Sequence, residues 1–233
     1  MDTILKISNL TKNYYNTQAL KGIDLEVERG KILGLLGPNG SGKTTLMKII
    51  AGILKPTSGE VLIEDKKPGI YTKQIVSYLP DVNPLYKWMR VKDAVNFFKD
   101  FYNDFDEEKA KSNLDFMELK ENQKVSSLSK GMLERLLLAL FLSRNAKLYV
   151  LDEPLGGVDP SARDKIIDTI IKNINEGSSM IISTHIISDI EKVFDEVAFI
   201  SEGKIILKEN AEELRAKKGK SIDEIFREVY ANV

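Results

Sequence analysis

Residues 31 to 50 read KILGLLGPNGSGKTTLMKII, and they predict a buried strand, a glycine-rich loop and a helix in that order. The nearly continuous apolar run at 31–36 is typical of a strand that is covered on both faces. Residues 37–44 match the pattern G-x-x-x-x-G-K-[ST], in the strand-to-helix context that the pattern requires. The stretch therefore predicts an α/β core that carries a phosphate-binding loop.

The residue types of this loop suit a polyphosphate and its magnesium ion. Glycines let successive backbone N–H groups turn toward phosphate oxygens, and the N-terminus of the following helix adds partial positive charge. Lys43 supplies a cation for the β and γ phosphates, and Thr44 offers its hydroxyl to Mg²⁺. The alternative, a turn that binds nothing, does not explain a lysine flanked by such glycines. We expect nucleotide contacts from Gly37, Pro38, Asn39, Gly40, Ser41, Gly42, Lys43, Thr44 and Thr45.

A pair of acidic residues follows a second buried strand. The segment LYVLDEP at 148–154 places Asp152 and Glu153 at the carboxyl end of that strand, where ligands collect in parallel α/β sheets. Asp152 would hold Mg²⁺, directly or through water, and Glu153 would polarise the water that attacks the γ-phosphate. The alternative is a solvated turn that only caps the helix expected at 160–174. The phosphate loop favours the catalytic interpretation.

The rest of the chain predicts one compact unit with a helical insertion. Apolar strands separated by a helix, at 147–152 and 179–184, have the spacing of a parallel pair. Apolar residues at steps of three and four from Val91 to Phe105 predict a long amphipathic helix. Further strands are expected at 4–8, 23–28, 59–65, 75–80 and in a hairpin at 196–209. We expect a catalytic core at 1–84 and 146–210, a helical subdomain at 85–145 and a helical tail at 211–233.

Composition excludes several classes of function. The 34 Lys and Arg residues nearly balance 35 Asp and Glu residues, so no general positive field attracts nucleic acid or acidic lipid. The absence of cysteine excludes disulfides and thiol catalysis, and the single histidine excludes a multi-histidine metal site. The longest apolar run, at 136–142, is far shorter than the roughly 20 residues that cross a bilayer. We therefore expect a soluble, intracellular protein without nucleic-acid binding, and interpret the basic residues at 214–220 as a solvated face.

Six motifs in a fixed order make the chain resemble the nucleotide-binding subunit of ATP-binding cassette (ABC) transporters, over about residues 5–203. They are Tyr14, the phosphate loop, LSKGM at 128–132, the acidic pair, GVDP at 157–160 and STH at 183–185. The resemblance implies a P-loop NTPase (RecA-like) core with an antiparallel β subdomain and an α-helical insertion. It also implies that the chain binds and hydrolyses ATP, with Mg²⁺ as its cofactor.

The resemblance further implies partners and a place in the cell. The LSKGM motif and the phosphate loop lie on one chain yet must meet the same nucleotide. Two copies, or this chain and a homologous subunit, would therefore close head to tail around two Mg·ATP. Hydrolysis would drive transport through separate membrane subunits, and the form of LSKGM favours the bacterial export type. The chain would be cytoplasmic, at the inner face of the cell membrane, and would contact the membrane only through those partners.

Individual residues match positions that have known roles in this family. An aromatic residue near the N-terminus stacks on adenine, and Tyr14 stands at the matching place, with Tyr15 as its rival. Ser129 and Gly131 match the signature motif that contacts the γ-phosphate held by the other subunit, although Ser129 also suits a helix N-cap. His185 matches the histidine that hydrogen-bonds the γ-phosphate. These four roles are implied by the resemblance.

Three positions depart from the family pattern. Lys130 and Met132 stand where glycine and glutamine are usual, and Asp81 stands where glutamine often touches Mg²⁺. A carboxylate at 81 can still ligand the metal, and a structural turn before Pro84 is the alternative.

Asp159 matches a loop aspartate that communicates across the dimer, and it equally suits the cap of the next helix.

The apolar segment after Asp81 leaves two interpretations open. Residues 82–90 offer an apolar face to a coupling helix of a membrane subunit, or they pack into the core of the insertion. Two other functions also remain as alternatives. The chain would be a hydrolysis-poor, ATP-gated half of a heterodimer if the three departures weaken its site. A soluble ABC protein of DNA repair or translation is disfavoured by the near-zero net charge.

Overall fold

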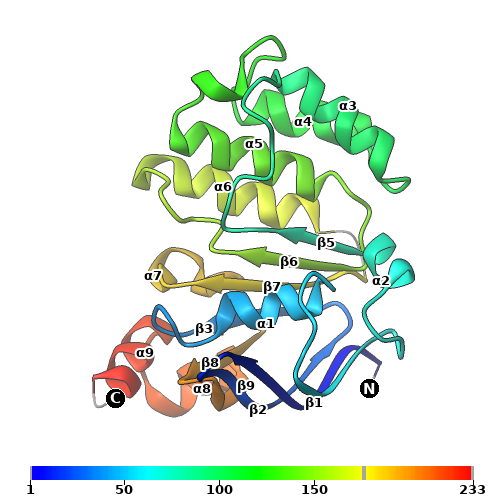
Figure 1. Ribbon diagram of the computed structural model, residues 1–233. Helices are drawn as coiled ribbons and strands as arrows, with labels where there is room; N and C mark the ends of the chain where they lie inside the picture. The colour runs from blue at the N-terminus through cyan, green and yellow to red at the C-terminus, as the bar shows by residue number, and fades with distance from the viewer. Residues whose placement is uncertain (1, 175–176, 232–233) are drawn as a thin grey trace.

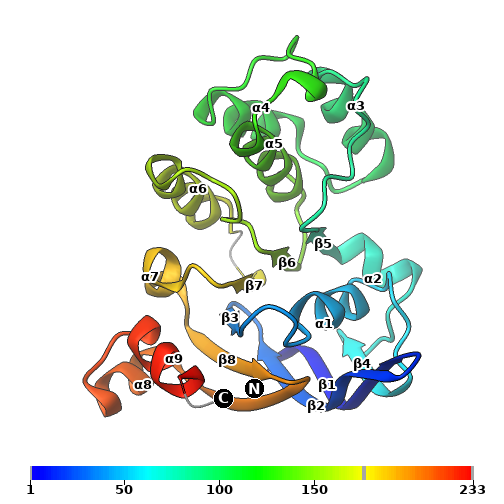
Figure 2. The same ribbon diagram turned by 60° about the vertical axis from the view of Figure 1, so that its left-hand side comes forward.

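The computed structural model describes residues 2–174 and 177–231 and contains two sheets (Figures 1 and 2). A three-stranded antiparallel sheet has the order β2-β1-β4, and a six-stranded mixed sheet has the order β5-β6-β7-β3-β8-β9. The strands are β1 (Thr3–Tyr14), β2 (Thr17–Glu28), β3 (Ile32–Leu36), β4 (Ser58–Ile63), β5 (Val76–Leu79), β6 (Leu148–Asp152), β7 (Ser179–Thr184), β8 (Glu196–Ser201) and β9 (Lys204–Asn210). This confirms the expected α/β core with an antiparallel β subdomain.

Helices cover the sheets and form the upper part of the molecule in Figure 1. Helix α1 lies between the two sheets, and α3, α4 and α5 form the helical insertion beyond β5 (Figure 2). The helices are α1 (Lys43–Ile50), α2 (Ile70–Ile75), α3 (Val91–Phe101), α4 (Glu107–Phe116), α5 (Lys130–Leu142), α6 (Pro160–Asn173), α7 (Ile187–Ile190), α8 (Ala211–Lys218) and α9 (Ile222–Tyr230), with short 3-10 turns at Val125–Ser127 and Glu191–Val193. Among the described residues, none of these helices has both the length and the apolar character to cross a membrane.

The register of the parallel strands brings the predicted motifs to one edge. Leu36 at the end of β3 pairs with Thr184 at the end of β7, and Asp152 at the end of β6 pairs with Ser183. The segments that leave these strands therefore start side by side. They carry the phosphate loop, the acidic pair and His185, at the left-hand edge of the sheet in Figure 1.

The predicted long helix from Val91 to Phe105 is too long, because α3 ends at Phe101. The chain turns at Asp104, whose carboxylate accepts hydrogen bonds from Arg144 Nε and Nη2 at 2.9 Å each. A new helix, α4, then begins behind Asp106, whose Oδ1 accepts from the backbone N–H of Lys109 at 2.9 Å. Apolar spacing alone could not predict this break, since the ring of Phe105 still packs 5.9 Å from that of Phe98.

Arg144 joins the helical insertion to the sheet. Its side chain is buried, and besides Asp104 it donates to the carbonyl of Val76 in β5 at 2.7 Å. Its guanidinium also lies 4.1 Å from the ring centroid of Tyr102. A buried arginine needs such complete pairing, because an unpaired buried charge is costly. The insertion is therefore anchored at the point where the chain returns to β6.

Candidate functional site

The phosphate loop closes around the ammonium group of Lys43 at the start of α1. Lys43 Nζ donates to the carbonyls of Gly37 at 2.6 Å and Pro38 at 3.1 Å, and the side chain is 6% exposed. Burial lowers the pKa of Lys43, while the nearby carboxylates of Glu153 and Asp152 oppose that shift. The loop thus holds one cation at its centre, where it can meet a phosphate group.

Two glycines of the loop have no room for a side chain. A Cβ at Gly37 would lie 2.4 Å from the carbonyl oxygen of Ile200. Gly42 has a φ of +110°, and a Cβ there would lie 2.9 Å from the carbonyl oxygen of Ala19 in β2. The loop therefore packs directly on two other strands, which explains why glycine is required at both of its ends.

Asp152 is a buried carboxylate with one free acceptor. It is 1% exposed at the end of β6, and its Oδ1 accepts from the hydroxyl of Ser183 at 2.7 Å. Oδ2 has no hydrogen-bond partner among the described residues. Burial raises the pKa of Asp152, although the hydroxyls of Ser183 and Thr44 oppose the shift. An orphaned buried carboxylate oxygen near a threonine hydroxyl fits a hard cation such as Mg²⁺, which prefers oxygen ligands.

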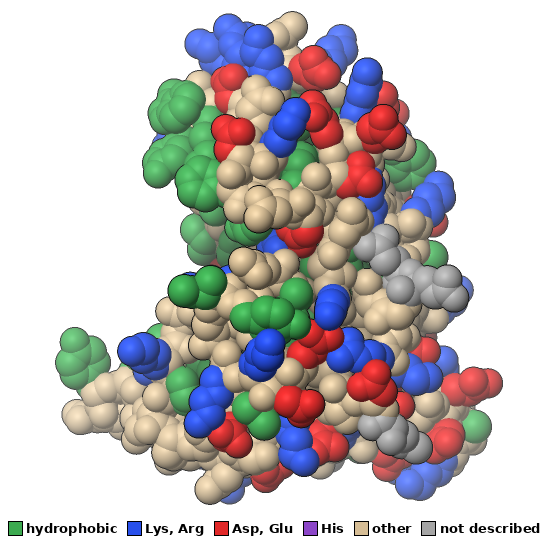
Figure 3. Space-filling view, turned by 90° about the vertical axis from the view of Figure 1, so that its right-hand side faces the viewer, with side chains coloured by type: hydrophobic (Ala, Val, Ile, Leu, Met, Phe, Trp, Pro, Cys, Tyr) green, Lys and Arg blue, Asp and Glu red, His purple; other side chains and the backbone are tan. Residues whose placement is uncertain are grey.

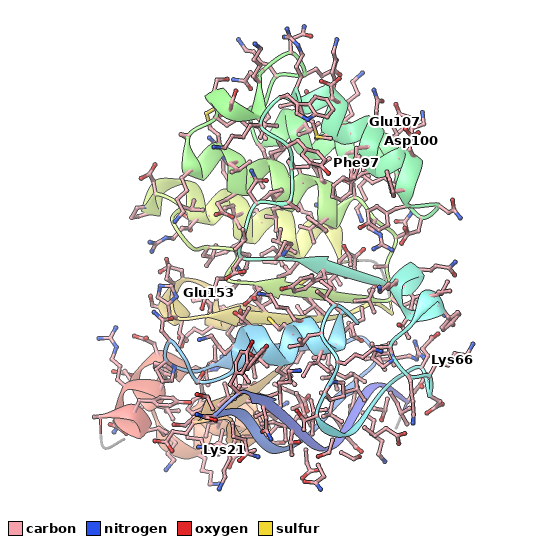
Figure 4. The ribbon with its side chains drawn as sticks, in the orientation of Figure 1. Lys21, Lys66, Phe97, Asp100, Glu107 and Glu153 are labelled. Carbon is pink, nitrogen blue, oxygen red and sulfur yellow. The ribbon has the colours of Figure 1, made fainter. Side chains whose placement is uncertain are left out.

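Glu153 lies between the phosphate loop and His185. Its Oε1 is 3.7 Å from Lys43 Nζ, and its Oε2 is 2.8 Å from His185 Nδ1. The backbone of Glu153 has a φ of +53°, which is uncommon for a residue other than glycine and is typical of functional sites. Its N–H donates to the Ser183 hydroxyl at 3.0 Å and so fixes this turn. In Figure 4, Glu153 stands at the edge of the sheet near the start of α1.

A cavity of about 240 Å³ opens above the loop. It brings the predicted loop residues 39–45 together with Glu153 and with Asp81, which enters from the segment after β5, whereas Gly37 and Pro38 do not line it. The sequence predictions did not include Ala19, because a small residue in a β-hairpin carries no signal. The lining residues are Ala19, Asn39, Gly40, Ser41, Gly42, Lys43, Thr44, Thr45, Asp81 and Glu153.

Ser183 is a further residue of the candidate site, and the sequence did not point to it. Its hydroxyl contacts both members of the acidic pair, at Asp152 Oδ1 and at the Glu153 N–H. The available signal was the motif STH at 183–185, in which only the histidine was singled out. Tyr78 was also missed, and its buried hydroxyl has no hydrogen-bond partner among the described residues. Burial and the charge of Asp152 raise the pKa of Tyr78.

Tyr14 and Tyr15 lie at the tip of the β1–β2 hairpin, outside the residues that line the cavity. Tyr14 is 41% exposed, and Lys12 Nζ lies 5.2 Å from its ring centroid. Tyr15 is fully exposed. The same hairpin carries Ala19, which does line the cavity, so the hairpin borders the site. Adenine stacking by Tyr14 stays a prediction.

The LSKGM motif begins helix α5, in the helical insertion. Ser129 is the N-cap, and its Oγ accepts from the backbone N–H of Met132 at 3.2 Å. Gly131 faces open space, and neither Ser129 nor Gly131 lines the cavity of this chain. Lys130 packs over Gly157, where a Cβ would come 2.2 Å from Lys130 Cε. The lysine that replaces the usual glycine is thus accommodated by a glycine of the GVDP motif.

Asp81 lines the cavity, and its charge also acts on a residue of α5. Burial raises the pKa of Glu134, in the second turn of α5, to about 7, with Lys130 opposing the shift and Asp81 adding to it. This electrostatic link connects the segment after β5 to the helix that carries the signature residues. Asp159 lies at the N-cap position of α6 with Pro160 at its first turn, as expected, but its side chain makes no capping hydrogen bond.

The segment at 82–90 has both buried residues, as expected for core packing, and exposed residues, as expected for a surface that contacts a membrane subunit. Leu85 and Met89 are buried in the core of the insertion, whereas Tyr86 and Trp88 are 57% and 68% exposed. The two exposed rings stack with centroids 5.9 Å apart. A groove of about 420 Å³ lies between the end of α1, β5 and the helical insertion, lined by Lys48, Ala51, Ile53, Lys73, Val76, Tyr78, Pro80, Pro84, Tyr102, Phe141 and Arg144. On the face shown in Figure 3, hydrophobic side chains gather mainly along one edge of the upper part of the molecule.

Comparison with known proteins agrees with this geometry. The ABC transporter family model matches residues 20–156. The lantibiotic transport ATP-binding protein SrtF of Streptococcus pyogenes is 34% identical over 91% of this chain and 95% of its own. The SkfA peptide export ATP-binding protein SkfE of Bacillus subtilis is 32% identical over 87% of each chain. The solved structure of an ATP-binding subunit of an ABC transporter superposes with a TM-score of 0.87 and 25% identity, over 97% of this chain and 99% of that one. The chain therefore belongs to the ABC transporter family and is an ATP-binding subunit with ATPase activity.

Proposed function

We propose that Glu153 activates the water that attacks the γ-phosphate of ATP bound above the phosphate loop. The main support is the position of its carboxylate, with Oε1 at 3.7 Å from Lys43 Nζ and Oε2 at 2.8 Å from His185 Nδ1. Lys43 exchanges its contacts with two neutral carbonyls for contacts with charged phosphate oxygens, which are stronger acceptors. Thr44 and Asp152, with Asp81 as a further ligand, would hold Mg²⁺, which would supply positive charge to offset that of the phosphates.

The contact between Glu153 and His185 changes when ATP binds. A neutral imidazole has one N–H, so in that form His185 cannot donate through Nδ1 to Glu153 and through Nε2 to the γ-phosphate at the same time. The γ-phosphate therefore draws the N–H donor of His185 away from the carboxylate. Glu153 Oε2 is then free to accept a proton of the attacking water.

A second subunit completes the nucleotide-binding site. Ser129 and Gly131 are exposed or open at the start of α5, and they lie outside the cavity of their own chain. Free N–H groups at the start of a helix of this length suit a phosphate oxygen offered by another chain. A head-to-tail pair brings each LSKGM motif to the partner's nucleotide, so closure requires ATP and hydrolysis reverses it.

The pair drives export through separate membrane subunits from the cytoplasmic face of the membrane. Tyr86 and Trp88 form an exposed aromatic pair in the segment whose residues Pro80 and Pro84 line the 420 Å³ groove, and exposed aromatic residues are typical of interfaces. The groove also carries Lys48 and Lys73, which favours a partner segment with carboxylates at its ends. Membership of a transporter family and the names of SrtF and SkfE support this direction.

The decisive experiment compares the purified chain with Glu153→Gln. Magnesium-dependent ATPase turnover and molar mass in ATP are measured for both. We expect turnover in the wild type, loss of turnover in the variant, and an ATP-dependent dimer that accumulates in the variant. Absence of turnover in both proteins would contradict the proposal and support the alternative of a hydrolysis-poor subunit in a heterodimer.

A further inference from the structure

The hydroxyl of Tyr230, in the last turn of α9, lies on the backbone that carries the phosphate loop. Tyr230 Oη donates to the carbonyl of Ile200 at 2.9 Å, and the carbonyl of Leu36 lies at 3.3 Å. Leu36 is the last residue of β3, and Ile200 is the last but one of β8, the neighbouring parallel strand. Burial raises the pKa of Tyr230, so the hydroxyl keeps its proton and acts as a donor to both carbonyls.

The two carbonyls are in direct contact with the loop. Leu36 is the residue before Gly37, and the Ile200 carbonyl oxygen would lie 2.4 Å from a Cβ at Gly37. The side chain of Ile200 also reaches the other end of the loop, with Cδ1 at 3.6 Å from a Cβ at Gly42. Ile200 thus touches both ends of the loop, and its carbonyl accepts the hydrogen bond from Tyr230.

The hairpin that follows Ile200 adds a further contact. The backbone N–H of Gly203 donates to the carbonyl of Ser41, in the middle of the loop, at 2.9 Å. A shift of the β8 end would therefore be felt by the loop at Gly37, at Ser41 and at Gly42. The phosphate loop therefore packs directly on the end of β8 and on the turn that follows it.

Helix α9 is held in place independently of the hydroxyl. The rings of Phe226 and Tyr230 pack 5.8 Å and 6.2 Å from the ring of Phe199, and 4.4 Å from each other. Ile222 and Ile225 on the same helix are buried. Figure 1 shows α9 at the edge toward which β5, β6 and β7 point. Removal of the Tyr230 hydroxyl alone therefore leaves the helix docked.

We propose that Tyr230 is a positioning residue for the phosphate loop. Its single O–H proton, shared between the carbonyls of Leu36 and Ile200, fixes the spacing of the strands at the point where the loop begins. A loop that is ordered beforehand loses less entropy when it closes around a polyphosphate. The C-terminal helix thereby increases the affinity of the chain for ATP. This role concerns nucleotide binding by one chain, so it requires neither the dimer nor the membrane subunits of the proposed function.

The test is Tyr230→Phe, which removes the hydroxyl and keeps the ring. Titration calorimetry with Mg·ATP should give a Kd about 3- to 10-fold higher than that of the wild type, the equivalent of one buried hydrogen bond. The KM for ATP should rise by a similar factor, while kcat at saturating ATP stays within about twofold. The matched control is Tyr149→Phe, which removes a buried hydroxyl that donates to the carbonyl of Arg144, away from the loop. It should leave the Kd unchanged.

Hydrogen–deuterium exchange of the nucleotide-free proteins gives a second readout. Amides of residues 37–43 should exchange faster in Tyr230→Phe than in the wild type, and at the wild-type rate in Tyr149→Phe. An unchanged Kd with unchanged exchange in Tyr230→Phe would overturn the proposal. So would an equal rise of Kd in both variants, because the effect would then be a general loss of stability.

Discussion

Glu153 Oε2 lies 2.8 Å from His185 Nδ1, which couples the carboxylate assigned to water activation to the residue assigned to the γ-phosphate. Glu153→Gln keeps the size of the side chain but removes its charge and its ability to accept a proton. We expect kcat to fall by about 100-fold or more, the usual contribution of a general base, with little change in the Kd for ATP. Single-turnover ATPase measurements check this. Ser183→Ala is the companion variant, because it disturbs the turn but leaves the carboxylate, and its kcat should fall less.

Lys130 adds a positive charge to a signature motif that usually has glycine there. Lys130→Gln should weaken ATP-driven dimerisation of a Glu153→Gln chain, and the salt dependence of dimerisation should become shallower. Lys124→Gln is a suitable control, since it removes an exposed lysine of the same insertion outside the motif. Sedimentation at two ionic strengths measures both effects. If dimerisation depends equally on salt in the Glu153→Gln chain and in the two chains that add Lys130→Gln or Lys124→Gln, Lys130 does not face the nucleotide.

Trp88 and Tyr86 form the exposed aromatic pair that we assign to the membrane subunit. Trp88→Ala should leave the ATPase activity of the isolated chain unchanged, because neither ring lines the nucleotide cavity. It should weaken co-purification with the membrane partner by about tenfold or more, as expected for an aromatic hot spot. Phe101→Ala, which removes an exposed ring at the end of α3, outside the segment at 82–90, is the control. A loss of co-purification in the control alone would contradict the assignment.

Glu134 makes stability depend on pH. Its pKa is about 7 in the folded chain and near 4.5 when unfolded, so the folded state binds more protons between these values. Stability should therefore fall as the pH rises from about 4.5 to 7. Glu134→Gln removes this dependence, and its melting temperature relative to the wild type should increase between pH 5 and pH 8. Glu118→Gln should show no such trend, because Lys165 lowers the pKa of Glu118. The same difference in melting temperature between Glu134→Gln and the wild type at pH 5 and at pH 8 would contradict this prediction.

Local patterns predicted most of the fold and the centre of the site. The phosphate loop, the acidic pair and the Ser129 cap each depend on a few neighbouring residues, so their chemistry is visible in the chain. The prediction of one helix from Val91 to Phe105 was wrong because the turn at Asp104 is stabilised by Arg144, a residue 40 positions later. Apolar periodicity does not report such a partner.

Contacts between distant segments could not be predicted for the same reason. Ser183 reaches Asp152 only because β6 and β7 pair in one register. Lys130 lies on Gly157, and Tyr230 reaches Ile200, through packing of elements that are far apart in the chain. The phosphate-loop and acidic residues that meet at the cavity were thus visible in the sequence, whereas the residues that pack against them were not.

Binding of ATP to Lys43→Ala tests the central claim most directly. Calorimetry with Mg·ATP should show binding to the wild type and a Kd roughly 100-fold higher for the variant, because the charge-assisted hydrogen bonds to phosphate are lost. Lys48→Ala, on the same helix but outside the nucleotide cavity, should bind as the wild type does. Equal affinity of Lys43→Ala and the wild type would contradict the assignment of the site.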